Sequence, residues 1–318
     1  MRNYYRVMLG QGSAHAAECF AGGFIGTDYE IEEDLTGRFH DRWRDFNREF
    51  IPIYQVIRPD KGRIAAGLAM GALWTVSKGI AHGDIVLSPD GRGACRVGEV
   101  TGEYSYATGG VLQHRRPVRW LDRVIAKAEM SEGLRGSTFT QGTAIGLNKQ
   151  AAEIEALLAG ASPPVAADQS LEVVGPLEQA QRVEDLVAFA MERHLEDFLV
   201  ENWAQTDLGR EYEVFVDEGE RLGKQYPTDT GPIDILAISK DKRRLLVVEL
   251  KKGRASDVVV GQVLRYMGYV KEELAEAGQE VQGVIIAMDD DHRVRRALSM
   301  TPSISFYRYQ VSFKLLKG

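Results

Sequence analysis

The chain changes its hydrophobic pattern about halfway along. From Tyr4 to Trp120, short apolar segments alternate with glycine, as in YYRVMLG, GGFIG, GDIVLSPDG and CRVGEVTGEYSYA. Short apolar runs bounded by turn residues are typical of β-strands. This half is therefore predicted to be a small β-rich domain with helices around residues 42–50 and 65–76, and residues 122–160 are expected to be mostly helical.

Residues 160–176 separate this half from the next. Their sequence, GASPPVAADQSLEVVGP, is dominated by proline, alanine and serine and has no period, which predicts a linker. Then come a long amphipathic helix, QAQRVEDLVAFAMERHLEDFLVENW, the strand-like segments EYEVFV, GPIDILAIS and RRLLVVELKK, a helix, VVVGQVLRYMGYVKEEL, and a strand, VQGVIIAM. This order predicts an α/β domain with a mixed sheet. The expected domains are therefore 1–159 and 177–318, joined by the linker.

Composition limits the classes of protein that remain. A length of 318 residues suits about two domains, and 44% hydrophobic content can fill ordinary cores. The net charge of −7 argues against a protein that coats polyanions in general, so any nucleic-acid contact should be local. Cys19 and Cys95 form no CxxC pair, which supports neither a disulfide framework nor a structural zinc site. Because the start lacks a signal-peptide core and no apolar run reaches ~18 residues, we expect a cytoplasmic protein without a membrane partner.

Charged residues stand inside two of the predicted core strands. Asp234 lies in the apolar run GPIDILAI, where a carboxylate is costly unless it is paired or holds a cation. Glu249 and Lys251 are two residues apart in VVELKK, so on a strand both side chains point to one face. If the strands are neighbours, two hard oxygen ligands for Mg²⁺ or Mn²⁺ meet a lysine that can orient or deprotonate water. The pattern predicts a phosphodiester hydrolase, and the alternative is an ordinary Glu249–Lys251 ion pair on an edge strand.

These residues resemble the PD-(D/E)xK nuclease superfamily, in which an aspartate is followed by Glu-x-Lys on the next strand. GPID supplies the first part of the formula, with Pro232 two residues before Asp234. The stretch IDILAISKDKRRLLVVELKKGRASDVVVGQVLRYMGYV is more specifically similar to the branch that contains the NucS-type endonucleases, where a helix glutamate precedes the core and a GQxxRY helix follows it. The resemblance extends from about Glu192 to the carboxy terminus. It implies an α/β domain of restriction-endonuclease-like type.

The resemblance also implies roles for individual residues. Asp234 and Glu249 would ligate Mg²⁺ or Mn²⁺, with the main-chain carbonyl of Leu250 as a third oxygen. Lys251 would act on the attacking water.

Three further residues would support this centre. Glu196 in HLEDFL corresponds to the helix glutamate that supports the metal shell, although Glu192 and Asp197 are adjacent alternatives. Gln262 and Tyr266 are four residues apart, hence on one helical face, and would position phosphate or the lysine.

Part of the first half resembles another family. From Trp74 to Leu121, the GDIV turn, the GEVTGxYxY strand and the HRRPVRW strand are similar to PUA-like modules, including those of EVE type. The resemblance implies an α+β domain with a PUA-like β-barrel that recognises a modified base in an aromatic-walled pocket. Stacking candidates are Trp43, Trp74, Tyr104 and Tyr106, and candidates for base edges and phosphate are His114, Arg115 and Arg116. Tryptophans are also ordinary core residues.

Together these features predict a Mg²⁺-dependent DNA endonuclease whose first domain senses a DNA feature, such as a modified base in restriction or phage defence. One alternative is a NucS-type repair endonuclease acting on mismatched or branched DNA. Another is a non-catalytic nucleic-acid-binding protein, against which the intact Asp234, Glu249 and Lys251 argue. The site does not distinguish DNA from RNA. Cutting both strands with one site per chain suggests a homodimer, whereas a nickase would need none.

Overall fold

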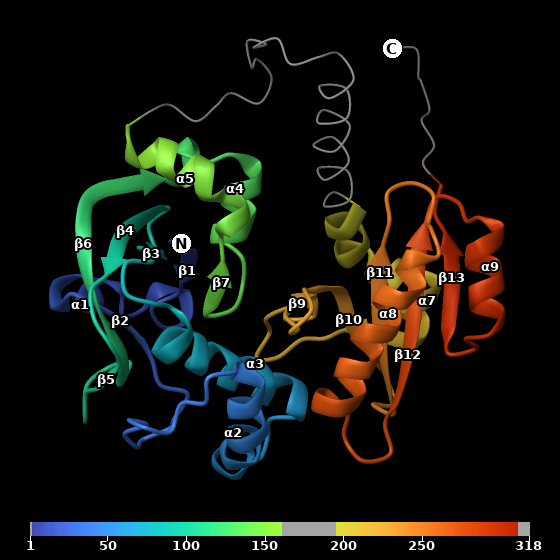
Figure 1. The fold of residues 1–318 in the computed structure, drawn as a ribbon, viewed down its shortest axis with the longest axis horizontal. Coiled ribbons are helices and arrows are strands. Elements are labelled where there is room, and N and C mark those ends of the chain that lie inside the picture. Colours follow the sequence, from blue (N-terminus) through green and yellow to red (C-terminus); the bar gives the residue numbers. More distant parts are fainter. Residues whose placement is uncertain (1, 161–194, 311–318) are drawn as a thin grey trace. The chain divides into compact units, whose positions relative to one another are not determined.

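The computed structural model describes residues 2–160 and 195–310. The chain divides into two compact units, Met1–Ser170 and Leu171–Gly318, which are described separately (Figure 1). The predicted linker lies outside the described residues except for Gly160, as does the first part of the long helix expected at residues 179–203. The described part of that helix covers residues 195–201.

The amino-terminal unit is built on a curved, mainly antiparallel sheet (Figure 1). Its strands are β1 (Tyr4–Val7), β2 (Phe24–Thr27), β3 (Ile85–Pro89), β4 (Ala94–Val100), β5 (Ser105–Tyr106), β6 (His114–Ala126) and β7 (Ala144–Gly146). The strand order is β2-β6-β4-β3-β1-β7, with β5 also on β6, and β1 and β3 are parallel. Within residues 2–160 no pairing joins β2 to β7, so the closed PUA-like barrel expected from the sequence is not confirmed.

The helices of this unit include both of those predicted. They are α1 (Ala16–Gly22), α2 (Trp43–Ile57), α3 (Arg63–Trp74), α4 (Glu132–Thr138) and α5 (Ala151–Leu158), and a π-helical turn, Thr75–Gly79, follows α3. The expectation that residues 122–160 are mostly helical is wrong in part, because β6 continues to Ala126 and β7 follows α4. Pairing with β4, in which Cys95 lies opposite Ile125, keeps this segment extended.

The sheet of this unit is buried on both faces. Along β3, Val86 packs into one apolar cluster, whereas Ile85 and Leu87 pack into another on the opposite face. A third cluster joins α2 to α3 through side chains such as Phe46 and Met70. This helical pair therefore has an apolar interior of its own.

The carboxy-terminal unit has the mixed sheet that the sequence predicted. Its strands are β8 (Tyr212–Val214), β9 (Lys224–Tyr226), β10 (Ile233–Ser239), β11 (Arg244–Leu250), β12 (Glu280–Ala287) and β13 (Ile304–Arg308). The order is β13-β12-β11-β10-β8, with β9 also on β10. Strands β11, β12 and β13 are parallel, whereas β10 is antiparallel to β8, β9 and β11.

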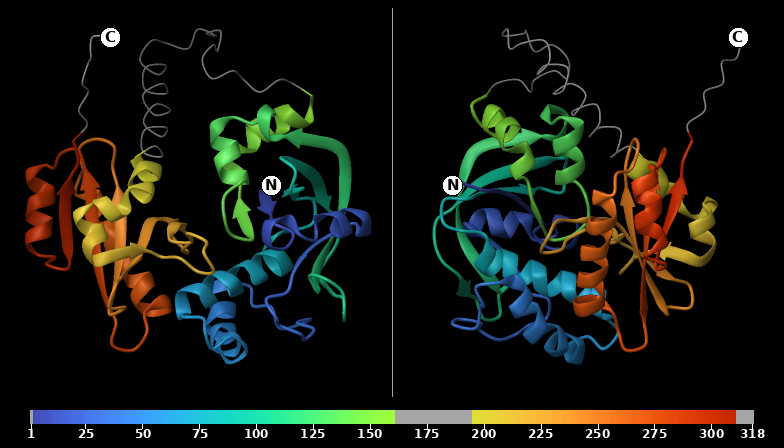
Figure 2. Two further views of the ribbon diagram at one scale, coloured as in Figure 1. Left: turned by 180° about the vertical axis from the view of Figure 1, so that it is seen from behind. Right: turned by 45° about the vertical axis from the view of Figure 1, so that its right-hand side comes forward.

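Helices cover both faces of this sheet. They are residues 195–201, α7 (Asp207–Glu211), α8 (Val258–Tyr269) with its π-helical extension Val270–Leu274, and α9 (His292–Ser299). The helix α8 lies in front of the sheet in Figure 1. In the reverse view, on the left of Figure 2, the yellow helices of residues 195–211 lie in front of the sheet. None of the helices in the described parts of the chain is long and apolar enough to cross a membrane.

The helix α8 approaches the sheet closely at Gly283 of β12. A Cβ atom at this position would lie 2.6 Å from Val263 Cγ1 and 2.8 Å from Met267 Sδ, both on α8. Contacts this short require the Val263 and Met267 side chains, or the helix that carries them, to shift. Glycine therefore sets the distance between α8 and β12.

We expect Gly283→Ala to destabilise the protein by about 1–3 kcal/mol, as added volume does in a packed interior. Gly268→Ala is the matched control, because Gly268 is exposed on α8 and its Cβ would meet no atom within 4 Å. This control should be neutral or stabilise the protein by up to about 1 kcal/mol, since alanine is the better helix former. Chemical denaturation of both variants tests this. Equal stability of the two would show that the contact is not tight.

Candidate active site

Two carboxylates lie opposite each other on neighbouring strands. In the antiparallel pair of β10 and β11, Ile235 is opposite Val248, and one further position along this register places Asp234 opposite Glu249. Side chains of opposed residues share a face, with Cβ atoms about 4.5–5.5 Å apart. Asp234 Oδ2 also accepts a hydrogen bond from the main-chain N–H of Leu250 at 2.8 Å. The predicted strands are therefore neighbours, and they bring the two acidic groups together.

Lys251 joins this pair from the residue after β11. Its Nζ donates to Glu249 Oε1 at 2.8 Å, and its side chain is 32% exposed, whereas that of Glu249 is 2% exposed. The ion pair considered from the sequence is therefore present. Its strand, however, lies in the interior of the sheet between β10 and β12, not at an edge. The carboxylate of Asp234 lies next to this ion pair. An ion pair with only a structural role would not require this third charged group.

Glu196 approaches the same place from the helix of residues 195–201. The carboxylate is buried, and its Oε2 accepts from Gln225 Nε2 at 2.8 Å. The same Gln225 Nε2 lies 3.2 Å from Asp234 Oδ1. Lys224 Nζ contacts Asp197 and lies 3.9 Å from Glu196 Oε1. Of the alternatives considered from the sequence, Glu196 is thus linked to Asp234, Asp197 pairs with Lys224, and Glu192 lies outside the described residues.

Burial controls the acidity of Glu196. Loss of solvation raises the pKa of this carboxyl to about 8; Lys224 opposes the rise and the charge of Asp234 adds to it. Lys224 and Gln225 are not predicted from the sequence. The sequence gives only a weak indication of these two residues, because they lie in a three-residue strand, KQY, with no distinctive pattern. Only the pairing of this strand with β10 places them beside the site.

The helix α8 places Gln262 and Tyr266 at the same end of the sheet. Gln262 Nε2 donates to the Tyr266 hydroxyl at 3.3 Å, so these residues share a helical face as predicted. A Cβ at Gly231 would lie 3.2 Å from that hydroxyl, and the φ of +117° at Gly231 also favours glycine in the turn before Asp234. The pKa of Tyr266 is raised, chiefly by burial and also by the charges of Glu249 and Asp234.

The donor set fits a hard divalent cation. Asp234 and Glu249 offer carboxylate oxygens, and the third predicted ligand, Leu250, would offer a main-chain carbonyl. Within residues 2–160 and 195–310 no group of three side chains from His, Cys, Asp and Glu is arranged to hold a metal. Two carboxylates with a carbonyl suit Mg²⁺ or Mn²⁺, because these ions keep several waters and need few protein ligands.

In the amino-terminal unit, the structure brings three of the predicted pocket residues together. The ring centroids of Tyr104 and Tyr106 lie 5.9 and 5.2 Å from that of His114. His114 is completely buried, with Nδ1 2.9 Å from the Tyr104 hydroxyl and Nε2 2.8 Å from the Ile31 carbonyl oxygen. Both ring nitrogens thus have partners inside the unit, and neither faces solvent.

The two predicted arginines also bind main-chain carbonyls within the unit. Arg116 is 2% exposed and donates to the carbonyls of Gly102 and Ser77 at 3.0 and 2.9 Å. Arg115 donates to the carbonyls of residues 111 and 112, and its guanidinium lies 3.9 Å from the centre of the Phe24 ring. In this arrangement both guanidinium groups stabilise loops and strands.

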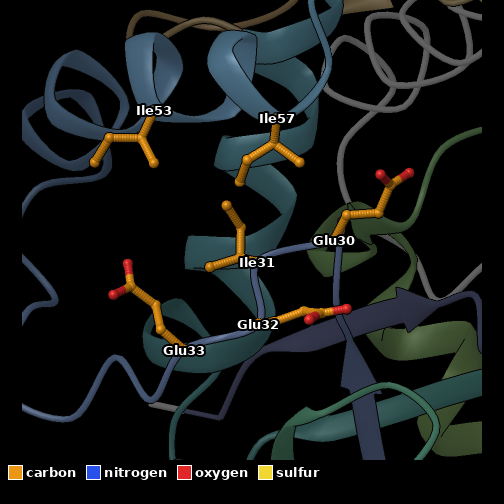
Figure 3. Close-up of a pocket in the computed structure, with 6 residues that line it drawn as sticks. All are labelled: Glu30, Ile31, Glu32, Glu33, Ile53 and Ile57. Carbon is orange, nitrogen blue, oxygen red and sulfur yellow. The ribbon is translucent and has the colours of Figure 1, made fainter.

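The predicted tryptophans flank the helical pair. Trp74 donates from Nε1 to the His40 carbonyl at 2.9 Å and packs against the α2–α3 cluster, whereas the half-buried Trp43 begins α2. A surface pocket of about 430 Å³ lies elsewhere in the unit (Figure 3). It is lined by Glu30, Ile31, Glu32, Glu33, Ile53 and Ile57, which include none of the predicted pocket residues. Three carboxylates make this pocket unfavourable for phosphate.

The burial of His114 predicts a pH-dependent stability. Burial lowers the pKa of His114, so the unfolded chain binds a proton at a higher pH than the folded chain does. The contribution that the buried neutral His114 makes to the free energy of unfolding is therefore complete above the ordinary histidine pKa of about 6.5. This contribution is lost as the pH falls below that value. We expect His114→Gln to flatten this dependence in thermal unfolding, and His82→Gln, at an exposed position, to leave it unchanged. Equal slopes in both variants would contradict the assignment.

Two family models match separate parts of the chain. Residues 5–148 match a domain of unknown function, DUF8426, and residues 192–308 match the endonuclease NucS C-terminal domain. No curated protein matches the chain.

Solved structures give weak similarities. The structure of an EndoMS–dsDNA complex is 14% identical with a TM-score of 0.30, and the match covers 72% of this chain and 66% of that one. A repair endonuclease from Pyrococcus abyssi is 16% identical with a TM-score of 0.26, and the match covers 70% of this chain and 66% of that one. This chain therefore spans slightly less than two thirds of either protein. The carboxy-terminal unit thus has a mixed α/β sheet and matches the model of the endonuclease NucS C-terminal domain, while the PUA-like character of the amino-terminal unit stays a prediction.

Proposed function

We propose that the chain is a metal-dependent endonuclease that hydrolyses phosphodiester bonds in DNA. The observation that carries this proposal is the opposition of Asp234 and Glu249 across β10 and β11, with Lys251 Nζ bound to Glu249. This arrangement occurs within residues that match a nuclease family model. A binding protein without catalysis would not need the lysine beside two carboxylates.

The residues divide the chemistry between them. Asp234, Glu249 and the carbonyl of Leu250 would hold Mg²⁺ or Mn²⁺, which supplies an activated water and stabilises negative charge on the phosphate. The Lys251 amine, fixed by Glu249, would orient the attacking water or, after releasing its own proton, accept the proton of that water. Gln262 and Tyr266 would orient the phosphate or the lysine from α8. Glu196 would support the ligand shell through Gln225.

The amino-terminal unit would select the DNA that is cut. Recognition of a modified base, as in restriction or phage defence, would use half-buried aromatic faces, such as those of Trp43 and Tyr106, for stacking. His114 and Arg116 already bind main-chain carbonyls inside the unit. The second candidate is repair cleavage of mismatched or branched DNA, favoured by the NucS match of residues 192–308. A double-strand cut with one site per chain suggests a homodimer in either case.

Lys251→Ala should lower the cleavage rate by about 10²–10⁴-fold, the range expected when a group that transfers a proton is removed. DNA affinity should stay nearly unchanged, since this amine is proposed to act on water. Lys240→Ala is the matched control, because this exposed lysine follows the other end of β10 and should leave both quantities unchanged. Cleavage rates and binding titrations decide the matter. Equal losses of rate and affinity in Lys251→Ala would instead assign the lysine to phosphate docking.

Digestion of matched substrates tests the metal and the selectivity together. Full-length protein should cut DNA with Mg²⁺ or Mn²⁺ and be inactive in EDTA, because the proposed ligands alone supply no activated water. Unmodified, methylated, hydroxymethylated and mismatched plasmids, with a matched RNA, then rank the candidate substrates. Preference for modified plasmid supports base recognition, and preference for mismatched DNA supports repair. Undiminished cleavage in EDTA would overturn the metal dependence.

A further inference from the structure

The geometry points to Gln225 as a positioning residue that fixes the Asp234 carboxylate for metal binding by tying it to Glu196. This inference rests on the proposed metal-dependent function of the same site. Gln225 lies on β9, outside the Asp, Glu-x-Lys and GQxxRY pattern of the sequence.

One amide group serves both carboxylates. Gln225 Nε2 lies 2.8 Å from Glu196 Oε2 and 3.2 Å from Asp234 Oδ1. A primary amide nitrogen carries two hydrogens, so it can donate to both acceptors at once. A neutral donor thus holds two acidic groups close together.

Both oxygens of Asp234 are held as a result. Gln225 contacts Oδ1, and the main-chain N–H of Leu250 donates to Oδ2 at 2.8 Å. Two donors on different oxygens restrict rotation of the carboxylate. Groups that orient a metal ligand in this way contribute strongly to metal affinity.

The strand pairing brings Gln225 to this position. In the antiparallel pair of β9 and β10, Tyr226 is opposite Ile233 and Lys224 is opposite Ile235, so Gln225 falls opposite Asp234. Asp234 therefore has Gln225 on one neighbouring strand and Glu249 on the other. The chain adopts a φ of +51° at Gln225, in the left-handed region that residues with a Cβ seldom occupy. This observed strain coincides with the two hydrogen bonds to the carboxylates.

The link to Glu196 joins two sides of the sheet. Val200 and Trp203, which follow Glu196, pack into the apolar cluster that contains Ile235. Asp234 precedes Ile235 on β10 and so points to the other face. Without β9, the helix carboxylate and the strand carboxylate would have no common partner among the described contacts.

Gln225→Gly separates positioning from stability. Glycine adopts a positive φ without strain, so this variant loses the amide without straining the backbone at this position. We expect its affinity for Mn²⁺, measured by isothermal titration calorimetry on the full chain without DNA, to fall about 10-fold or more. Lys242→Gly is the matched control: Lys242 has a φ of +60° in the turn between β10 and β11. It should keep the parent affinity.

Asp234→Asn separates failure of this inference from failure of the proposed function. If the parent binds Mn²⁺, Asp234→Asn does not and Gln225→Gly binds as the parent does, the positioning role is overturned and the metal site stands. If the parent binds no Mn²⁺, or Asp234→Asn binds equally well, the metal site itself is wrong and the inference falls with it. Thermal unfolding of each variant excludes misfolding as the cause of lost binding.

Discussion

The antiparallel pairing of β10 with β11 is the interaction on which the candidate site depends. Its register places Asp234 opposite Glu249 on one face and the apolar residues Ile235 and Val248 together on the other. A slip of one residue would turn an acidic side chain into the apolar cluster and expose an apolar one. The burial of Ile235 and Val248 therefore fixes the register, and that register also brings the carboxylates together.

The elements around this pair complete the site in different ways. The tight contact at Gly283 brings α8 against β12, and Tyr266 of that helix reaches the turn at Gly231. On the other side, β9 connects Asp234 to the buried Glu196 through Gln225. The centre therefore depends on packing at some distance from the reacting groups, and small backbone shifts in α8 or β9 would change the positions of its polar groups.

The amino-terminal unit uses its polar side chains differently. His114 and Arg116 are buried and bind main-chain carbonyls, and they share the interior with apolar clusters on both faces of the sheet. Such groups are costly to bury unless their hydrogen bonds are satisfied, and here protein partners satisfy them. Their first role is to hold loops in place. The DNA recognition proposed for this unit would therefore use more exposed side chains.

Sequence alone determined the mixed α/β class of the second unit, both long helices of the first, and the grouping of Asp234, Glu249 and Lys251, because strand and helix periods and buried charges are local signals. Tertiary structure alone decided three things: that β6 continues to Ala126, that the arginines and His114 point inward, and that Gln225 bridges two carboxylates. Each of these depends on pairing or packing with residues distant in the chain. The pattern of neighbouring residues cannot specify such contacts, because their energy arises only when the segments meet.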